Sequence, residues 1–300
     1  MGYNIFMDAI RDRHGRRLNI AFYGANGGSV KLTPAGLEAA MRVKRALRAK
    51  QALPGAPDFF ARSFKKLLGL TPVKTCVRLW NGKKIFLHVP PDIGNFLNDI
   101  DGIILRDQYS AGAVRGKAVV DAGANIGIFS LYARALGAKK IYAFEAVRET
   151  FAMLKRNLTL NRAGGKIEAV NIALGKERRT AELLYSPHGE GSAAIAGGGR
   201  VNRSVTYPGR RQVRVAPLDA LVKGEIGFLK MDVEGYEKNV LLGAAGLIGK
   251  HKPVLSFAAY HRKNDREELP RAVLRIANNY KITFNTFAEH NYYCEYMEAL

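Results

Sequence analysis

From residue 118 onward, short β-branched or apolar runs alternate with longer runs at helical spacing, and this alternation limits the folds open to the chain. We expect strands at about residues 118–121, 140–144, 167–171, 226–232 and 253–259. We expect helices near residues 126–136, 147–161, 237–245 and 266–279. Strands and helices in alternation imply right-handed crossovers. The pattern therefore predicts an α/β fold on a mostly parallel, doubly wound sheet.

Two further β-rich runs stand near the end of the sequence. They are YKITFNTF at residues 280–287 and NYYCEYM at residues 291–297. A short, mostly polar segment separates them, so the two runs can pair with each other. We expect an antiparallel pair beside the parallel strands.

The first 70 residues read as a basic extension in front of this fold. They hold 13 basic and 4 acidic side chains. Thr33-Pro34 is a typical helix start, because an N-cap residue precedes proline at the first helical position. FFARSFKKLLGL, at residues 59–70, has the spacing of a short amphipathic helix. We therefore expect residues 1–70 to be a basic, partly helical extension.

A β-hairpin is expected between this extension and the alternating region. Residues 73–90 contain two β-rich runs joined by Asn81-Gly82, a dipeptide typical of two-residue hairpin turns. We expect the hairpin to lead into a single domain over residues 71–300.

Positive charge is the main bias of the composition. The chain has 47 Lys and Arg against 26 Asp and Glu, a formal net charge of +21. A charge of this size attracts anions such as nucleic acid, acidic lipid headgroups or phosphorylated substrates. Residues 186–217 form an Arg-rich stretch that we expect to be an irregular lid or mobile loop. Its arginines are Arg200, Arg203, Arg210, Arg211 and Arg214.

Cysteine content and hydropathy favour a cytoplasmic protein. Cys76 and Cys294 are the only cysteines, too few for a disulfide framework. Asp8 and Asp12 fall where a signal peptide needs an apolar run, and no segment reaches the roughly 18 apolar residues of a membrane span. We expect a cytoplasmic chain without an integral membrane segment.

The turn between the first expected strand and helix has the sequence DAGANIG, residues 121–127. A dinucleotide-binding turn has the pattern G-x-G-x-x-G, whose glycines let the backbone approach a pyrophosphate. Here Asn125 stands where the second glycine would be, between Gly123 and Gly127. Asp121 would repel a pyrophosphate, whereas its carboxylate suits an ammonium or a sulfonium.

A second acidic residue, Glu145, closes the next expected strand. A carboxylate at this place can accept hydrogen bonds from both hydroxyls of a ribose. One acid for an amino group and one for a ribose fit S-adenosylmethionine better than they fit NAD. The two acids, Asp121 and Glu145, therefore predict an S-adenosylmethionine site at this edge of the sheet.

These residues also carry a family resemblance. VVDAGANIGIFSLYARALGAKKIYAFEA, then NIALG and IGFLKMDVEGYEKNVLLGA, resemble the FkbM family of class I S-adenosylmethionine-dependent methyltransferases. The D-x-G-x-N-x-G turn and the K-x-D-V-E-G-Y-E segment carry most of the likeness. The resemblance covers about residues 90–297 and implies a seven-stranded, Rossmann-like sheet whose last strand is antiparallel. It also implies methyl transfer to a hydroxyl oxygen of a sugar, lipid or natural product.

The resemblance implies a set of cofactor residues. The methionine end of the pocket would be shaped by the turn, Glu145 would hold the ribose, and two residues after the third strand would lie beside the adenine. The full set is Asp121, Gly123, Asn125, Gly127, Glu145, Asn171 and Ala173.

Catalytic candidates follow the last two parallel strands. Asp232 and Glu234, in KMDVEG, end one strand, and His261 follows the next. His261 is the preferred general base, because an unperturbed pKa near 6.5 lets it accept a proton at physiological pH. Asp232 could instead orient the cofactor or the acceptor. A third possibility is that Asp232, Glu234 and His261 hold a divalent metal, although the favoured hypothesis needs none.

Three functions stay open at this stage. The first is O-methylation of a sugar-like, lipid or natural-product hydroxyl, as the resemblance implies, on an acceptor that the positive charge of the chain suggests is anionic. The second is methylation of RNA, for example at a ribose 2′-hydroxyl, with residues 1–70 and the Arg-rich loop 200–214 gripping phosphates. The third is a basic binding module with a vestigial cofactor pocket. Loops set the choice of acceptor, so the sequence does not identify it.

Overall fold

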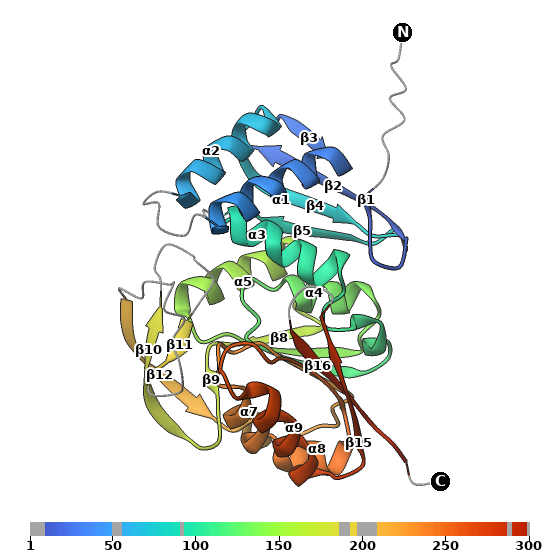
Figure 1. Cartoon of the computed structure of the whole chain (residues 1–300), viewed down its shortest axis with the longest axis vertical. Helices are drawn as coiled ribbons and strands as arrows, with labels where there is room; N and C mark the ends of the chain where they lie inside the picture. Colours follow the sequence, from blue (N-terminus) through green and yellow to red (C-terminus); the bar gives the residue numbers. More distant parts are fainter. Residues whose placement is uncertain are drawn as a thin grey trace. The chain divides into compact units, whose positions relative to one another are not determined.

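A seven-stranded sheet forms the centre of the computed structural model (Figure 1). Its order is β15-β16-β14-β13-β6-β7-β8. β16 is antiparallel to both of its neighbours, and the other pairs are parallel. The predicted Rossmann-like sheet with an antiparallel last strand is confirmed. The strands are β6 (Ala118–Ala122), β7 (Lys140–Phe144), β8 (Ile167–Val170), β13 (Phe228–Met231), β14 (Val254–Ala258), β15 (Tyr280–Asn285) and β16 (Asn291–Tyr296).

The structure describes residues 10–49, 56–90, 93–185, 193–196, 209–286 and 290–298. Part of the Arg-rich stretch, with Arg200 and Arg203, lies outside these ranges. Within the described part of the chain, no helix is both long and apolar enough to cross a membrane.

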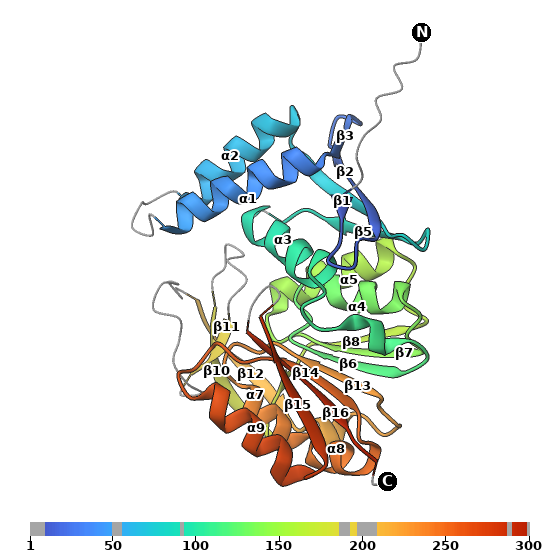
Figure 2. The same ribbon diagram turned by 45° about the vertical axis from the view of Figure 1, so that its right-hand side comes forward.

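Helices cover both faces of the seven-stranded sheet. α4 and α5 lie on one face, and α7, α8 and α9 lie on the other (Figures 1 and 2). Because both faces are covered, the central strands β6 and β13 are buried along almost their whole length rather than at alternate residues. Four of these helices were expected, and α8 was not. Their bounds are α4 (Ile128–Ala135), α5 (Arg148–Leu160), α7 (Glu237–Gly243), α8 (Ala245–His251) and α9 (Asp265–Ile276).

A four-stranded sheet of order β11-β10-β12-β9 interrupts the alternation after β8. The expectation of an irregular loop over residues 186–217 is wrong for the described parts of that stretch. β12 pairs with β10 in an antiparallel ladder and with β9 in parallel, and an apolar cluster that includes Leu183 and Val215 lies beneath. A short helix, α6 (Leu218–Leu221), follows. The strands are β9 (Ala173–Leu174), β10 (Arg179–Tyr185), β11 (Ala193–Ile195) and β12 (Gly209–Ala216).

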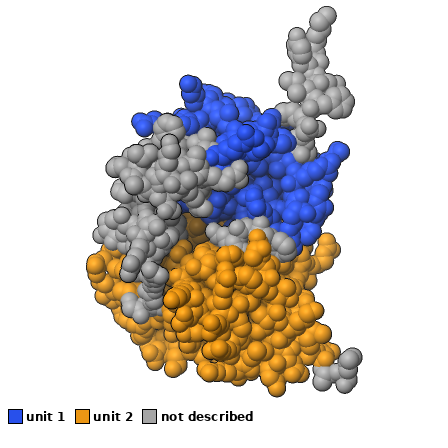
Figure 3. Space-filling model, viewed as in Figure 1, with its two compact units in different colours: residues 1–106 blue, residues 107–300 orange. Residues whose placement is uncertain are grey.

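The chain divides into two compact units, residues 1–106 and residues 107–300 (Figure 3). The predicted hairpin is present, but it belongs to the first unit, so this division falls later than the boundary expected after residue 70. The reason is that β4 pairs with β2 over most of its length. The first unit contains β1 (Ile10–Arg11), β2 (Arg17–Gly24), β3 (Ser29–Leu32), α1 (Pro34–Ala49), α2 (Ala56–Leu68), β4 (Pro72–Arg78), β5 (Lys84–His88) and α3 (Ile93–Asp99).

The first unit has a core of its own. Its five strands are all antiparallel, and β2 alternates between buried and more exposed residues. Leu18, Ile20 and Phe22 are fully buried, and the ring of Phe22 meets that of Phe64 edge to face at 5.4 Å between centroids. Burial at every second residue shows that one face of this sheet packs against helices.

Candidate active site

The turn after β6 is held in a left-handed backbone conformation. Gly123, Asn125 and Gly127 have φ angles of 73°, 50° and 92°. At Gly123 a Cβ atom would lie 1.8 Å from the carbonyl oxygen of Asp232, so the glycine is needed for space as well as conformation. Asparagine is among the few other residues that adopt this region readily. The backbone therefore explains why asparagine can replace the second glycine of the dinucleotide pattern.

Glu145 holds this turn from the end of β7. Its Oε2 accepts a hydrogen bond from the backbone N–H of Asn125 at 2.9 Å, and its Oε1 accepts one from Val147 at 2.8 Å. Burial raises the pKa of Glu145, and the two backbone donors oppose that shift. The amide of Asn171 donates to the backbone carbonyls of Glu145 and Ala146. The structure thus brings the predicted ribose residue, the turn and Asn171 together.

Asp121 lies in the sheet with its carboxylate fully buried. Its Oδ2 accepts a hydrogen bond from the Ser130 hydroxyl at 2.6 Å, and its Oδ1 is 3.1 Å from the ammonium of Lys230. Asp121 and Lys230 are directly opposite each other in the β6–β13 register. The cation that Asp121 meets is therefore a side chain of the protein, which the sequence interpretation did not foresee.

Lys230 connects the cofactor turn to β13. Its Nζ donates to the carbonyl of Gly123 at 2.8 Å and lies 5.2 Å from the ring centroid of Tyr109. Burial disfavours its charge, but the surrounding carboxylates, Asp121 first, outweigh burial and raise the pKa of the ammonium. A single lysine in the apolar run GFLKM was the sequence signal for this residue.

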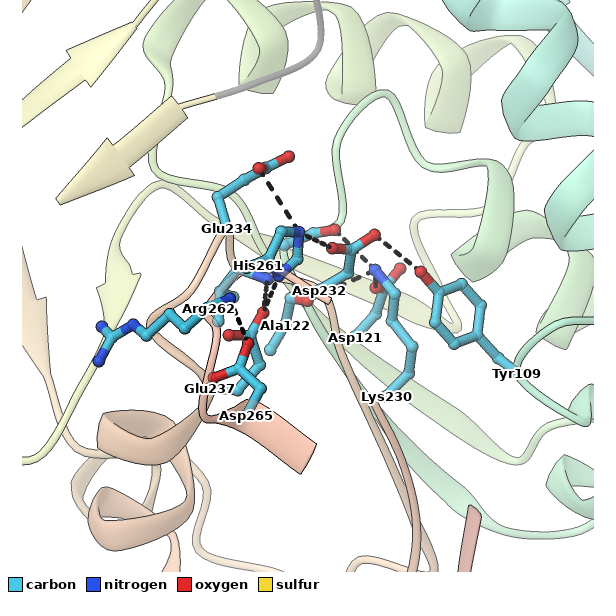
Figure 4. Close-up of polar contacts among 12 residues, drawn as sticks. Tyr109, Asp121, Ala122, Lys230, Asp232, Glu234, Glu237, His261, Arg262 and Asp265 are labelled. Carbon is cyan, nitrogen blue, oxygen red and sulfur yellow. Dashed lines mark hydrogen bonds and ion pairs between the residues drawn. The ribbon is translucent and has the colours of Figure 1, made fainter. Parts of the chain in front are cut away.

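Asp232 follows β13 and faces two groups (Figure 4). Its Oδ2 accepts a hydrogen bond from the hydroxyl of Tyr109 at 2.7 Å, and its Oδ1 is 3.5 Å from Nε2 of His261. About a quarter of its side chain, 26%, is exposed. Sequence reasoning missed Tyr109, because it lies far from Asp232 in the chain and carries no motif.

Glu234, in the loop after β13, has a strained backbone conformation. Its φ angle is 53°, a conformation that costs a non-glycine residue about 1–2 kcal/mol. Its Oε2 lies 3.5 Å from Nε2 of His261. Strain of this kind concentrates at functional sites, where the side chain has to be held in one direction.

His261 follows β14 and is surrounded by carboxylates (Figure 4). Its Nδ1 is 3.0 Å from Oε1 of Glu237, and its side chain is only 8% exposed. Burial opposes the imidazolium, but Glu237, Glu234 and Asp232 outweigh burial and raise the pKa of His261 to about 10. The pKa of Glu237 is lowered, because the charge of His261 overcomes the effect of burial.

This environment corrects the argument for His261 as general base. The expectation of a pKa near 6.5 is wrong, since the carboxylate that matters most, Glu237, was not among the candidates. A histidine with a pKa of about 10 already carries its proton at neutral pH. The structure does bring Asp232, Glu234 and His261 together, as the sequence predicted.

Ala173 is the one predicted cofactor residue that lies in a different sheet. It pairs with Val215 in the four-stranded sheet and is buried in the cluster that includes Val147 and Tyr236. The other predicted residues converge at the carboxyl ends of the parallel strands β6, β7, β8, β13 and β14.

Fold and site together define a class. A seven-stranded sheet with one antiparallel strand and an acidic residue after the second strand are the features of class I methyltransferases. Comparison with known families agrees, since the FkbM methyltransferase domain matches residues 121–293. The chain belongs to the FkbM methyltransferase family.

Similar proteins are found among curated sequences and solved structures. Methyltransferase 1 of Beauveria bassiana is 31% identical over 144 residues, covering 42% of this chain and 57% of that protein. Methyltransferase sdnD of Sordaria araneosa is 41% identical over 78 residues, covering 26% of this chain and 30% of that protein. A crystal structure of methyltransferase FkbM from Methylobacillus flagellatus covers 67% of this chain and 54% of that chain, with 19% identity and a TM-score of 0.46. The matched part of the chain thus spans between 30% and 57% of the length of each of these proteins.

Proposed function

We propose that the protein is an S-adenosylmethionine-dependent methyltransferase that methylates a hydroxyl oxygen. The observation that carries the proposal is the meeting of two groups at one edge of the sheet. One is the left-handed turn held by Glu145, and the other is the cluster of Asp232, Glu234 and His261. The backbone N–H of Asp232 donates to the carbonyl of Ala122 at 3.1 Å, so the two groups are neighbours.

The residues of the turn fit this cofactor. Glu145 accepts one backbone hydrogen bond on each oxygen, and a carboxylate oxygen has two lone pairs, so both oxygens can still accept from ribose hydroxyls. Its side chain lies at the surface edge of the core, where the residue is 9% exposed. Asp121 and Lys230 support the turn from beneath, since Lys230 donates to the carbonyl of Gly123.

When bound, S-adenosylmethionine would supply a methyl carbon for in-line attack by an oxygen, and its positively charged sulfur would leave as a neutral thioether. The acceptor hydroxyl loses its proton in that attack, and the chain has to receive it. We assign this role to Oδ2 of Asp232, because the side chain is partly exposed and this oxygen keeps a second lone pair beside the hydrogen bond from Tyr109. We assign His261 and Glu234 to positioning Asp232 and the acceptor.

Two guanidinium nitrogens of Arg262, the residue after His261, favour an anionic acceptor. Nε and Nη2 of Arg262 are buried, and neither has a hydrogen-bond partner among the described residues. A buried donor without a partner is costly, and a carboxylate or phosphate of the acceptor would satisfy it. We expect Arg262→Gln to raise KM for the acceptor much more than it lowers kcat.

The experiment that tests this function uses methyl-labelled S-adenosylmethionine. The protein is incubated with separate cell fractions containing RNA, lipid, polysaccharide and small molecules. Label in polysaccharide, lipid or small molecules, stable to conditions that cleave methyl esters, supports O-methylation of a hydroxyl. No transfer to any fraction, with the cofactor bound, would contradict it.

Methylation of RNA stays a second candidate because of the net charge of +21. Two arginines of the Arg-rich stretch are already paired, however. Arg210 lies 3.1 Å from Glu182, and Arg211 makes two 2.8 Å hydrogen bonds to Glu149. Binding of RNA should weaken steeply with salt, with a slope set by the number of phosphates contacted. Label in the RNA fraction together with that slope would favour RNA over a small acceptor.

A further inference from the structure

The cluster around His261 leaves three buried polar atoms without partners. Among the described residues, no hydrogen-bond partner is found for Oδ1 of Asp232, Oε2 of Glu237 or Nε2 of His261. The Glu237 side chain is 1% exposed and the His261 side chain 8%. Buried polar atoms are normally hydrogen-bonded, so three such atoms at one place call for an explanation.

An ion pair between an imidazolium and its carboxylates does not explain them. An imidazolium among carboxylates should donate from both ring nitrogens at about 2.7–2.9 Å. Nδ1 does approach Glu237 closely, at 3.0 Å. Nε2, in contrast, is 3.5 Å from both Asp232 and Glu234 and makes no hydrogen bond to either.

The spacing instead suits atoms that share a metal ion. Two donor atoms bound at about 2.1 Å to one first-row divalent cation lie about 3.0–3.5 Å apart at bond angles near 90–110°. The 3.5 Å distances from Nε2 of His261 to the oxygens of Asp232 and Glu234 agree with that spacing.

Glu237 orients the histidine for this role. Its Oε1 also accepts the backbone N–H of Val233 at 3.0 Å, and an ionised carboxylate only accepts. Nδ1 of His261 must therefore be the donor, which turns Nε2 toward Asp232 and Glu234, where a bound cation would take the place of the Nε2 proton. A carboxylate behind a histidine is the usual support of a metal-binding imidazole.

We propose that Nε2 of His261 and Oδ1 of Asp232 bind a divalent cation, with Glu234 as the nearest further ligand. One nitrogen with several carboxylate oxygens suits a transition cation such as Mn²⁺ better than Mg²⁺ or Ca²⁺, which take oxygen ligands. Binding of the cation to this site does not depend on the proposed methyl transfer.

The test is a titration of the full-length protein with Mn²⁺, after treatment with EDTA and dialysis, without cofactor or acceptor. Electron paramagnetic resonance measures free Mn²⁺ directly. We expect one Mn²⁺ per chain, with affinity at least tenfold weaker in Asp232→Asn and in His261→Gln. Glu168→Gln, which changes an exposed carboxylate of β8, should bind as the wild type does.

Two results would overturn the site. One is a wild-type protein that binds no Mn²⁺ at millimolar concentration. The other is unchanged binding in both Asp232→Asn and His261→Gln. Circular dichroism confirms that each variant is folded, and the wild-type result stands even if one variant is not. Because methyl transfer plays no part in the measurement, a negative result leaves the proposed function to its own test.

Discussion

Two buried clusters of carboxylates and a cationic side chain lie at neighbouring strand ends, and they differ in how closely the cationic group approaches its carboxylates. In the first, Lys230 contacts Asp121 at 3.1 Å and the carbonyl of Gly123 at 2.8 Å. In the second, the Nε2 atom of His261 makes no hydrogen bond and stands 3.5 Å from each of two carboxylates. The first cluster is closed and supports the cofactor turn. The second is open, as a site for an ion or a reacting group has to be.

The largest effect should come from opening the closed cluster. Lys230→Met leaves the buried carboxylate of Asp121 without its cation, and breaking such a pair costs about 3–5 kcal/mol. Chemical denaturation should show a loss of that size in the free energy of unfolding. Adding Asp121→Asn should restore part of it, because no buried charge then remains. A fully stable Lys230→Met would mean that this pair does not support the fold.

In the open cluster around His261, a substitution should reduce turnover strongly and change the free energy of unfolding little. Asp232→Asn should reduce turnover about a hundredfold or more, since it removes the proposed proton acceptor. Its free energy of unfolding should change by about 1 kcal/mol or less, because the side chain is partly exposed and the amide can still accept from Tyr109. Steady-state kinetics with the acceptor that takes the label checks this. Undiminished turnover would remove Asp232 from the mechanism.

Glu234→Gly separates function from stability most cleanly. Glycine relieves the left-handed backbone at this position, so the variant should be as stable as the wild type or slightly more stable. It should still lose activity, by about tenfold, because one carboxylate no longer faces His261. Thermal unfolding and turnover are measured on the same preparation. A variant that is both less stable and fully active would reverse this prediction.

The smallest effect is expected for Tyr109→Phe. It removes one hydrogen bond to Asp232, worth about 1 kcal/mol, and leaves the ring that packs on Phe129. Turnover should fall about fivefold with KM for the cofactor unchanged. A change in cofactor KM instead would place Tyr109 on the cofactor side of the site.

Local pattern sufficed for the main sheet and for most of the site. β6, β7 and β14 are apolar runs that stop at polar turns, and Asp121, Glu145 and Asp232 stand at or just after strand ends, where the topology brings them together. Partners that lie far apart in the chain could not be predicted in this way. Lys230 meets Asp121 only through the register of β6 and β13.

Two other differences have the same physical origin. The hairpin over residues 73–90 was predicted, yet its place in the first unit depends on pairing with β2, which alternates buried and exposed residues without a motif. The pKa of His261 depends on Glu237, which in the sequence is only the first residue of the helix expected near residues 237–245. Pairing and burial in the fold decide both features.

The account depends most on the turn held by Glu145, and calorimetric titration with S-adenosylmethionine tests it directly. We predict saturable binding of one cofactor per chain in the wild type and at least tenfold weaker binding in Glu145→Gln. Glu149→Gln is the matched control, because that exposed carboxylate pairs with Arg211 and not with the turn. No binding by the wild type, or equal binding by Glu145→Gln, would contradict the cofactor site.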